Sequence, residues 1–163
     1  MDLDSVYNVE YTRNVRRGAA SMRLIEYRNG TASIVEVKQL LSYAAGSSSE
    51  RLNQILDKVY SGPSTKLYVM TDNNMVLGII GSKRSEDSAE ILHLAVDTHK
   101  RRQGIGRKMV DEWMALERPV EVTAETDHDA VGFYRKYGFM IHSLGEKYPG
   151  VERFLCRFIA QSR

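Results

Sequence analysis

The chain has little cysteine, little net charge and no long apolar run, and each of these absences excludes a class of protein. Among its 163 residues Cys156 is the one cysteine, so no disulfide can form within the chain. No Cys/His spacing suits zinc, and we expect no bound metal and a reducing, cytoplasmic setting. A net charge of +2 gives no reason to expect nucleic-acid binding. No apolar run approaches the length of a membrane span, and the first residues lack a signal-peptide pattern, so we expect no membrane association.

The remaining composition is that of an ordinary globular protein, with 42% hydrophobic and 27% charged residues. We predict one domain over residues 22–163, which is long enough to bury a core. Residues 1–21 are polar and basic, and we interpret them as a flexible N-terminal arm.

Hydrophobic periodicity and turn residues predict an alternation of strands and helices. Strands dominate the middle of the chain, and the crossover helices favour an α/β protein with a mixed sheet and helices on both faces. The predicted strands are 22–27, 66–71, 75–83, 89–96, 120–125, 139–144 and 152–159, and the predicted helices are 33–45, 50–60, 104–118 and 127–137.

The most informative segment is the turn Arg101-Arg102-Gln103-Gly104-Ile105-Gly106, which lies between a predicted strand and a predicted helix. The first N–H groups of a helix lack intrahelical partners, and the helix dipole adds positive potential there. Glycines let a ligand approach the main chain, and arginines bind phosphate oxygens. The turn therefore predicts a cradle for a pyrophosphate. It lacks the Gly-Lys-Ser/Thr ending of a Walker A loop and the glycine pattern of a dinucleotide fold.

A second motif, Phe133-Tyr134-Arg135-Lys136-Tyr137-Gly138-Phe139, ends a predicted short helix. From helical spacing alone, its aromatic residues are typical of a core. The two motifs together, in their strand and helix context, resemble the GNAT superfamily of N-acetyltransferases, whose order of elements is similar over about residues 22–160. The resemblance implies the acyl-CoA N-acyltransferase fold, with acetyl-CoA as co-substrate.

The resemblance also implies roles for individual residues. The pantetheine arm of acetyl-CoA would lie along Leu94, Ala95 and Val96, and a backbone N–H near Val96 would stabilise the thioester oxygen. Tyr134 would donate a proton to the leaving thiolate, and Asp127 occupies a position where many members carry an asparagine near the pantetheine arm. The implied cofactor-binding residues of the turn are Arg101, Arg102, Gln103, Gly104, Ile105, Gly106 and Arg107.

The acceptor amine must also lose a proton, and Glu90 is the first candidate base. Strand alternation predicts that Glu90 shares a face with Leu92, Leu94 and Val96. A carboxylate on an apolar face is unusual, but Glu90 at the exposed end of its strand is an equally good interpretation. Glu125 and His93 are weaker candidates, and bulk water is a further proton acceptor.

We therefore expect a single-domain N-acetyltransferase that moves an acetyl group from acetyl-CoA to a primary amine within a ternary complex. A small-molecule amine is the first expectation, with the acceptor site lined by the two early helices and a 145–151 loop. The alternatives are a protein lysine or N-terminal amine, a non-catalytic acyl-CoA-binding module of the same fold, and a nucleotide-phosphate binder. A homodimer is compatible with the resemblance.

Overall fold

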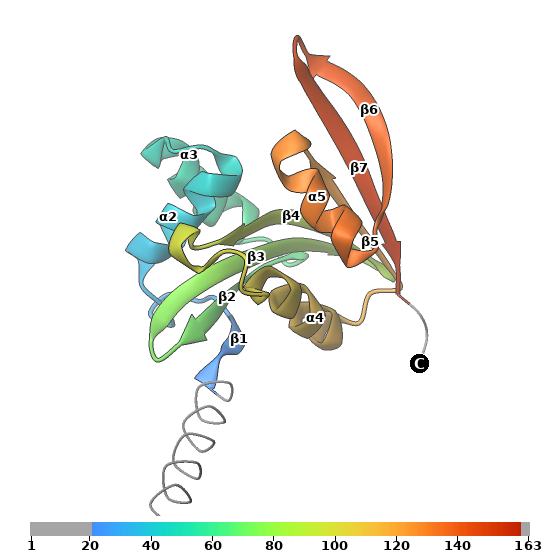
Figure 1. Ribbon diagram of the computed structural model, residues 1–163. Coiled ribbons are helices and arrows are strands. Elements are labelled where there is room, and N and C mark those ends of the chain that lie inside the picture. The colour runs from blue at the N-terminus through green and yellow to red at the C-terminus, as the bar shows by residue number, and fades with distance from the viewer. Residues whose placement is uncertain (1–20, 161–163) are drawn as a thin grey trace, which may run out of the picture.

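The computed structural model describes residues 21–160, and a seven-stranded mixed sheet runs through this part of the chain (Figure 1). Its strand order is β1-β2-β3-β4-β5-β7-β6, and every neighbouring pair is antiparallel except β4 and β5. The predicted N-terminal arm, residues 1–21, lies outside the described residues except for its last one. The strands are β1 Arg23–Glu26, β2 Thr65–Asp72, β3 Met75–Ser85, β4 Ser88–Val96, β5 Glu121–Thr126, β6 Met140–Tyr148 and β7 Val151–Ile159.

Helices cover both faces of the sheet, as the sequence predicts (Figure 1). The helices α2 Ile34–Ala45 and α3 Ser49–Gln54 close one core against β2, β3 and the end of β4. The helices α4 Ile105–Glu117 and α5 His128–Tyr137 close a second core on the opposite face. None of the helices described combines the length and apolarity needed to cross a membrane.

The two early helices begin where serine side chains cap them. Ser33 accepts a hydrogen bond from the Glu36 N–H, and Ser48 accepts one from the Arg51 N–H. The predicted helix 50–60 forms, but its second half, Ile55–Val59, is a π-helix, η1. The Tyr60 N–H donates to the Ile55 carbonyl at 3.1 Å, which is the i→i+5 bond of that helix type.

Consecutive strands pair as hairpins at β2–β3, β3–β4 and β6–β7. Asn73 and Asn74 join β2 to β3 with φ of 48° and 67°, in the left-handed region that asparagine tolerates. The last hairpin, β6–β7, extends well beyond the rest of the sheet (Figure 1). The expected 145–151 loop is therefore wrong, because β6 continues to Tyr148 and only Pro149 and Gly150 connect it to β7.

A β-bulge in β4 decides which of its side chains share a face. Gly81 of β3 pairs with His93 and Ser82 pairs with Ile91, so Leu92 is an extra residue. Ile91, Leu94 and Val96 consequently all pack on the α4/α5 side. The predicted common face of Glu90 with Leu94 and Val96 is wrong, because the extra residue reverses the alternation between them.

The centre of the α4 core contains one buried polar contact. Trp113 of α4 donates its Nε1–H to the Ser82 Oγ at 3.1 Å, and both side chains are buried. A buried N–H group without an acceptor costs free energy, because it has lost its water partners. The hydroxyl of Ser82 therefore stabilises the packing of α4 on β3.

We predict that Ser82→Ala lowers the free energy of unfolding by about 1–3 kcal/mol, because it leaves the Trp113 N–H without an acceptor. Urea denaturation followed by tryptophan fluorescence measures the change. Ser47→Ala, at an exposed position between α2 and α3, is the matched control and should alter stability little. Equal stabilities of the Ser82 and Ser47 variants would contradict this account.

Candidate functional site

The candidate site is built around the divergence of β4 and β5. These parallel strands pair only from Ser88 with Glu121 to Ile91 with Ala124, although β4 continues to Val96. The Asp97 N–H donates to the Leu77 carbonyl of β3 at 2.8 Å. Because successive residues of a strand direct their N–H groups to opposite sides, the N–H groups of Leu94 and Val96 point into the gap.

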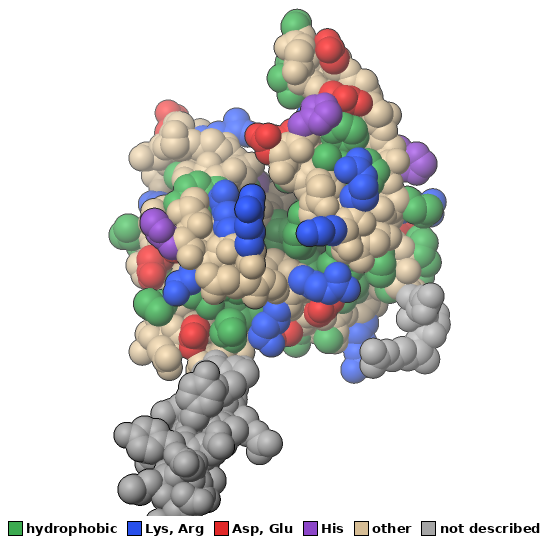
Figure 2. Space-filling model, viewed as in Figure 1, with side chains coloured by type: hydrophobic (Ala, Val, Ile, Leu, Met, Phe, Trp, Pro, Cys, Tyr) green, Lys and Arg blue, Asp and Glu red, His purple; other side chains and the backbone are tan. Residues whose placement is uncertain are grey.

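A cavity of about 1080 Å³ occupies this gap and extends between the early helices and α5. In the space-filling view a hollow divides this face of the molecule, and lysine and arginine side chains lie on both sides of it (Figure 2). The predicted site residues that line the cavity are Leu94, Ala95, Val96, Arg101, Arg102, Gly104, Ile105, Gly106, Arg107, Asp127 and Tyr134.

Two predicted site residues do not line the cavity. Glu90 is exposed and lies where β4 is still paired with β5, before the gap opens. Gln103 is exposed at the tip of the turn. The structure therefore does not bring the predicted base, Glu90, together with Tyr134.

The turn between β4 and α4 has the geometry of an anion cradle. The Asp97 carboxylate accepts the His99 N–H at 2.8 Å and caps a short 3₁₀ turn, η2 Thr98–Lys100. Arg102 and Gly104 then adopt positive φ values of 60° and 78°, which turn the chain into α4. No side chain caps α4 and no acidic residue occupies its first turn, so its first N–H groups keep their positive potential.

The two glycines of the turn serve different purposes. A Cβ at Gly104 would meet nothing within 4 Å, so this position needs glycine for its left-handed backbone. A Cβ at Gly106 would lie 3.1 Å from the Phe133 Cε2 atom. Gly106 therefore permits the close packing of α4 on α5, a reason that the sequence did not reveal.

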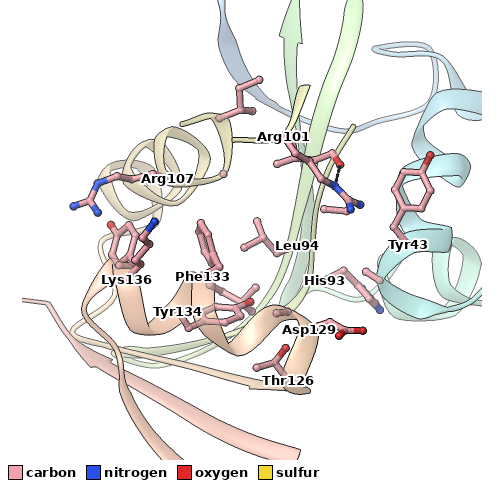
Figure 3. A pocket seen from close by; sticks show the side chains of 18 of the residues that line it. Tyr43, His93, Leu94, Arg101, Arg107, Thr126, Asp129, Phe133, Tyr134 and Lys136 are labelled. Atoms are coloured by element: carbon pink, nitrogen blue, oxygen red, sulfur yellow. Dashed lines mark hydrogen bonds between the residues drawn. The ribbon is translucent and has the colours of Figure 1, made fainter. Parts of the chain in front are cut away.

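Two arginines at the cavity are held by aromatic rings. Arg101 donates its Nε–H to the Val96 carbonyl at 3.2 Å, and its guanidinium carbon lies 5.4 Å from the ring centroid of Tyr43. The guanidinium carbon of Arg107 lies 4.9 Å from the Tyr137 ring centroid. These contacts place one cation on each side of the cavity (Figure 3).

Tyr134 is buried, yet it lines the cavity (Figure 3). Its ring packs edge-on against Phe133 and Phe139, with centroids 5.3 and 5.2 Å away. Within residues 21–160 its hydroxyl has no hydrogen-bond partner. Burial raises the pKa of the Tyr134 phenol above its usual range, and the nearby Cys156 adds to this effect. The phenol thus remains protonated, with an O–H to donate at neutral pH.

Two of the carboxylates at the end of the cavity near β5, Asp127 and Glu125, already have partners. Asp127 accepts the N–H groups of Asp129 and Ala130 at 3.0 and 3.2 Å and so caps α5. Glu125 accepts from the Lys147 Nζ and the Arg153 Nε at 3.3 and 3.2 Å, and the hydrogen bond from Arg153 is the chief cause of its lowered pKa. Among residues 21–160, no group of three His, Cys, Asp or Glu side chains is arranged to hold a metal ion.

Several lining residues carry no motif that could have revealed them. Tyr43 and Ala44 come from the end of α2, and Arg153 comes from β7. They reach the cavity through the packing of whole elements, which leaves no local signal in the sequence. His93 was a weaker candidate in the sequence, and the structure places it in the cavity lining.

Comparisons with known proteins agree with this geometry. Residues 63–141 match the family model of the acetyltransferase (GNAT) domain, a stretch that contains both sequence motifs. A GNAT family acetyltransferase from Elizabethkingia anophelis with acetyl-CoA bound is 21% identical, with 86% of this chain and 99% of that chain covered and a TM-score of 0.64.

Two further solved structures have the same fold. An aminoglycoside 6'-N-acetyltransferase complexed with coenzyme A is 15% identical, with 87% and 99% of the two chains covered and a TM-score of 0.70. The ribosomal-protein-S18-alanine N-acetyltransferase from Escherichia coli is also 15% identical, with 87% and 96% covered and a TM-score of 0.69. Residues 63–141 thus correspond to the acetyltransferase (GNAT) domain, and the described part of the chain has the acyl-CoA N-acyltransferase fold of these proteins.

Proposed function

We propose that the protein is an acetyl-CoA-dependent N-acetyltransferase that acetylates a primary amine by direct attack within a ternary complex. The observation that carries the proposal is the strand gap, where unpaired N–H groups of β4, the positive start of α4 and the Tyr134 phenol all border one cavity. The similar structure from Elizabethkingia anophelis with acetyl-CoA bound supports the choice of co-substrate.

The described residues offer matching groups for the pyrophosphate and the pantetheine arm of acetyl-CoA. The N–H groups of residues 102–107 and the side chains of Arg101, Arg102 and Arg107 would bind the pyrophosphate. The amides of the pantetheine arm would pair with the open side of β4 at Leu94 and Val96. Ala95 directs its backbone to β3 instead, so its part is to keep β4 in register.

The same placement sets the chemistry of transfer. The Val96 N–H, which points into the gap, would stabilise the negative charge that develops on the thioester oxygen during attack. The C–S bond then breaks, and the Tyr134 phenol would give its proton to the leaving thiolate. The attacking nitrogen then loses its second proton. Water carries this proton to the Tyr134 phenolate, which becomes a phenol again.

A small-molecule amine is the acceptor that we propose first. Of the three carboxylates at the β5 end, Glu125 is ion-paired and Asp127 caps a helix, so among the described residues Asp129 alone adds an uncommitted negative charge, which is little for a polycation. A protein amine is the second candidate, and the structural similarity to the Escherichia coli ribosomal-protein-S18-alanine N-acetyltransferase favours its inclusion.

The proposal is tested by free-thiol release from acetyl-CoA with a panel of small amines, lysine peptides and peptides with free N-termini. We expect one small-amine class to raise thiol release above hydrolysis and to yield the acetylated amine by mass spectrometry. Peptide acceptors alone would support the second candidate. Tight CoA binding with no amine-dependent release would instead support a binding module, and equal competition by ATP would indicate a nucleotide-phosphate site.

Gly104→Glu should abolish measurable CoA binding, because it adds bulk, a negative charge and a strained positive φ of 78° at the proposed pyrophosphate cradle. Isothermal titration calorimetry measures the affinity, and circular dichroism checks that the variant is folded. Gly132→Glu, on the exposed side of α5, introduces the same charge and should leave the affinity unchanged. Normal affinity in the Gly104 variant would refute this placement of the pyrophosphate.

Tyr134→Phe should lower kcat by about 100-fold or more while it changes CoA affinity little, because it removes the proton donor and keeps the ring. Stopped-flow and steady-state thiol release separate the two effects. Tyr27→Phe, directly after β1 and outside the cavity lining, is the matched control. A kcat that survives Tyr134→Phe would leave this tyrosine with a packing role alone.

A further inference from the structure

His93 is a half-buried histidine in the cavity lining, on the opposite face of β4 from Leu94. Its Nδ1 atom lies 2.5 Å from the Tyr60 hydroxyl, and the two rings meet edge-on with centroids 5.7 Å apart. A histidine held at one ring nitrogen can present the other nitrogen in a fixed direction. Figure 3 shows His93 and Tyr134 approaching the cavity from different sides.

The fold makes a specific place for the Tyr60 hydroxyl. Tyr60 follows the π-helix η1, whose last bond runs from its N–H to the Ile55 carbonyl. A Cβ at Gly81 would lie 1.8 Å from the Tyr60 hydroxyl oxygen, so any other residue there would displace the tyrosine. Gly81 is also the β3 partner of His93, which means that the sheet register brings all three residues together.

The β4 bulge directs His93 to this place. Without the extra residue Leu92, His93 would share a face with Ile91 and would point into the α4/α5 core. Bulges of this kind redirect side chains next to active sites. The Tyr60–His93 pair therefore depends on two irregularities, one in β4 and one in the helix that precedes β2.

The surroundings keep His93 neutral. Burial lowers the pKa of the imidazole, and the positive charge of Arg51 on α3 lowers it further. The other charged groups that line the same cavity near β5 are Glu125, Asp127, Asp129 and Arg153. Burial also raises the pKa of Tyr60 above its usual range, so its phenol stays protonated beside the ring.

We propose that His93 is the base that takes the first proton from the acceptor amine, with Tyr60 as its positioning residue. This inference rests on the proposed acetyl transfer. The ammonium N–H bond breaks and its proton passes to Nε2, while Nδ1–H remains bonded to the Tyr60 oxygen. The freed nitrogen lone pair then attacks the thioester carbon, and the imidazolium later returns its proton to water.

The two carboxylate candidates fit this role less well. Glu90 is exposed and lies outside the cavity. Glu125 lines the cavity, but its bonds from Arg153 and Lys147 lower its pKa and make it a weaker base. A neutral histidine opposite Tyr134 also separates the proton acceptor from the proton donor, since they lie on opposite faces of β4.

The first test uses the folded wild-type protein and needs no activity. In ¹⁵N-edited NMR spectra, neutral His93 should carry its proton on Nδ1, which leaves Nε2 free to accept. His93→Gln identifies the signal. A proton on Nε2 in the neutral ring would overturn the proposal, because that atom would then be a donor.

The second test is the pH dependence of kcat/KM in the thiol-release assay. His93→Gln should lower the rate about 100-fold or more at pH 7 and remove the ionisation on the acid side of the profile, with CoA affinity retained. Tyr60→Phe should keep that ionisation but move it to lower pH, because the imidazolium loses an acceptor. His142→Gln, at an exposed position of β6, is the matched control.

The outcomes separate this inference from the proposed function. An acid limb that survives His93→Gln and disappears in Glu90→Gln would overturn the role of His93 while acetyl transfer stands. An acid limb unmoved by Tyr60→Phe would remove the positioning role of Tyr60. A wild-type protein that binds CoA but transfers acetyl to no amine would overturn the proposed function itself, whatever the tautomer of His93.

Discussion

The divergence of β4 from β5 is the constraint on which the rest of the site depends. A parallel pair normally satisfies the inner backbone groups of both strands, but here the pairing stops at Ile91 and Ala124. The remaining N–H groups of β4 stay available in a partly enclosed space, where a hydrogen bond is stronger than in water. The Val96 carbonyl already accepts a hydrogen bond from Arg101, so at this position the N–H is the backbone group left to bind a ligand. The absence of β4–β5 pairing beyond Ile91 and Ala124 thus produces both the volume and the polarity of the cavity.

Two irregularities decide which side chains border that gap. The extra residue Leu92 sends Leu94 and Val96 to the α5 side and His93 to the α3 side. Tyr60 directly follows the π-helix Ile55–Val59, and this position brings its hydroxyl within hydrogen-bond distance of His93. Both features cost regular hydrogen bonding, and both lie beside the cavity, where such departures from regular structure commonly concentrate.

The sequence was most informative where a feature depends on neighbouring residues. The anion turn, the serine caps, the Asn73-Asn74 hairpin and the aromatic helix end were all predictable, because each is a short-range pattern. The bulge was not, since it is defined by the pairing of two strands. Its effect was large, because the extra residue places Glu90 on the same face of β4 as His93, opposite Leu94, whereas strict alternation had placed Glu90 with Leu94. The order of the candidate bases changed with it.

The length of β6 is a second feature that depends on strand pairing and that local sequence patterns do not reveal. Tyr148, Pro149 and Gly150 indicated a loop, yet the strand continues to Tyr148 because β7 supplies its partners through two register shifts. Cross-strand pairing therefore overrode a local turn signal, just as helix packing brought Tyr43 to Arg101 without any motif. The site combines both kinds of information. Short-range patterns define its positive turn and its tyrosine, whereas long-range register defines the side that would receive the acceptor. A family resemblance that rests on short-range patterns consequently says little about the long-range register of the strands. The identity of the acceptor depends mainly on that register.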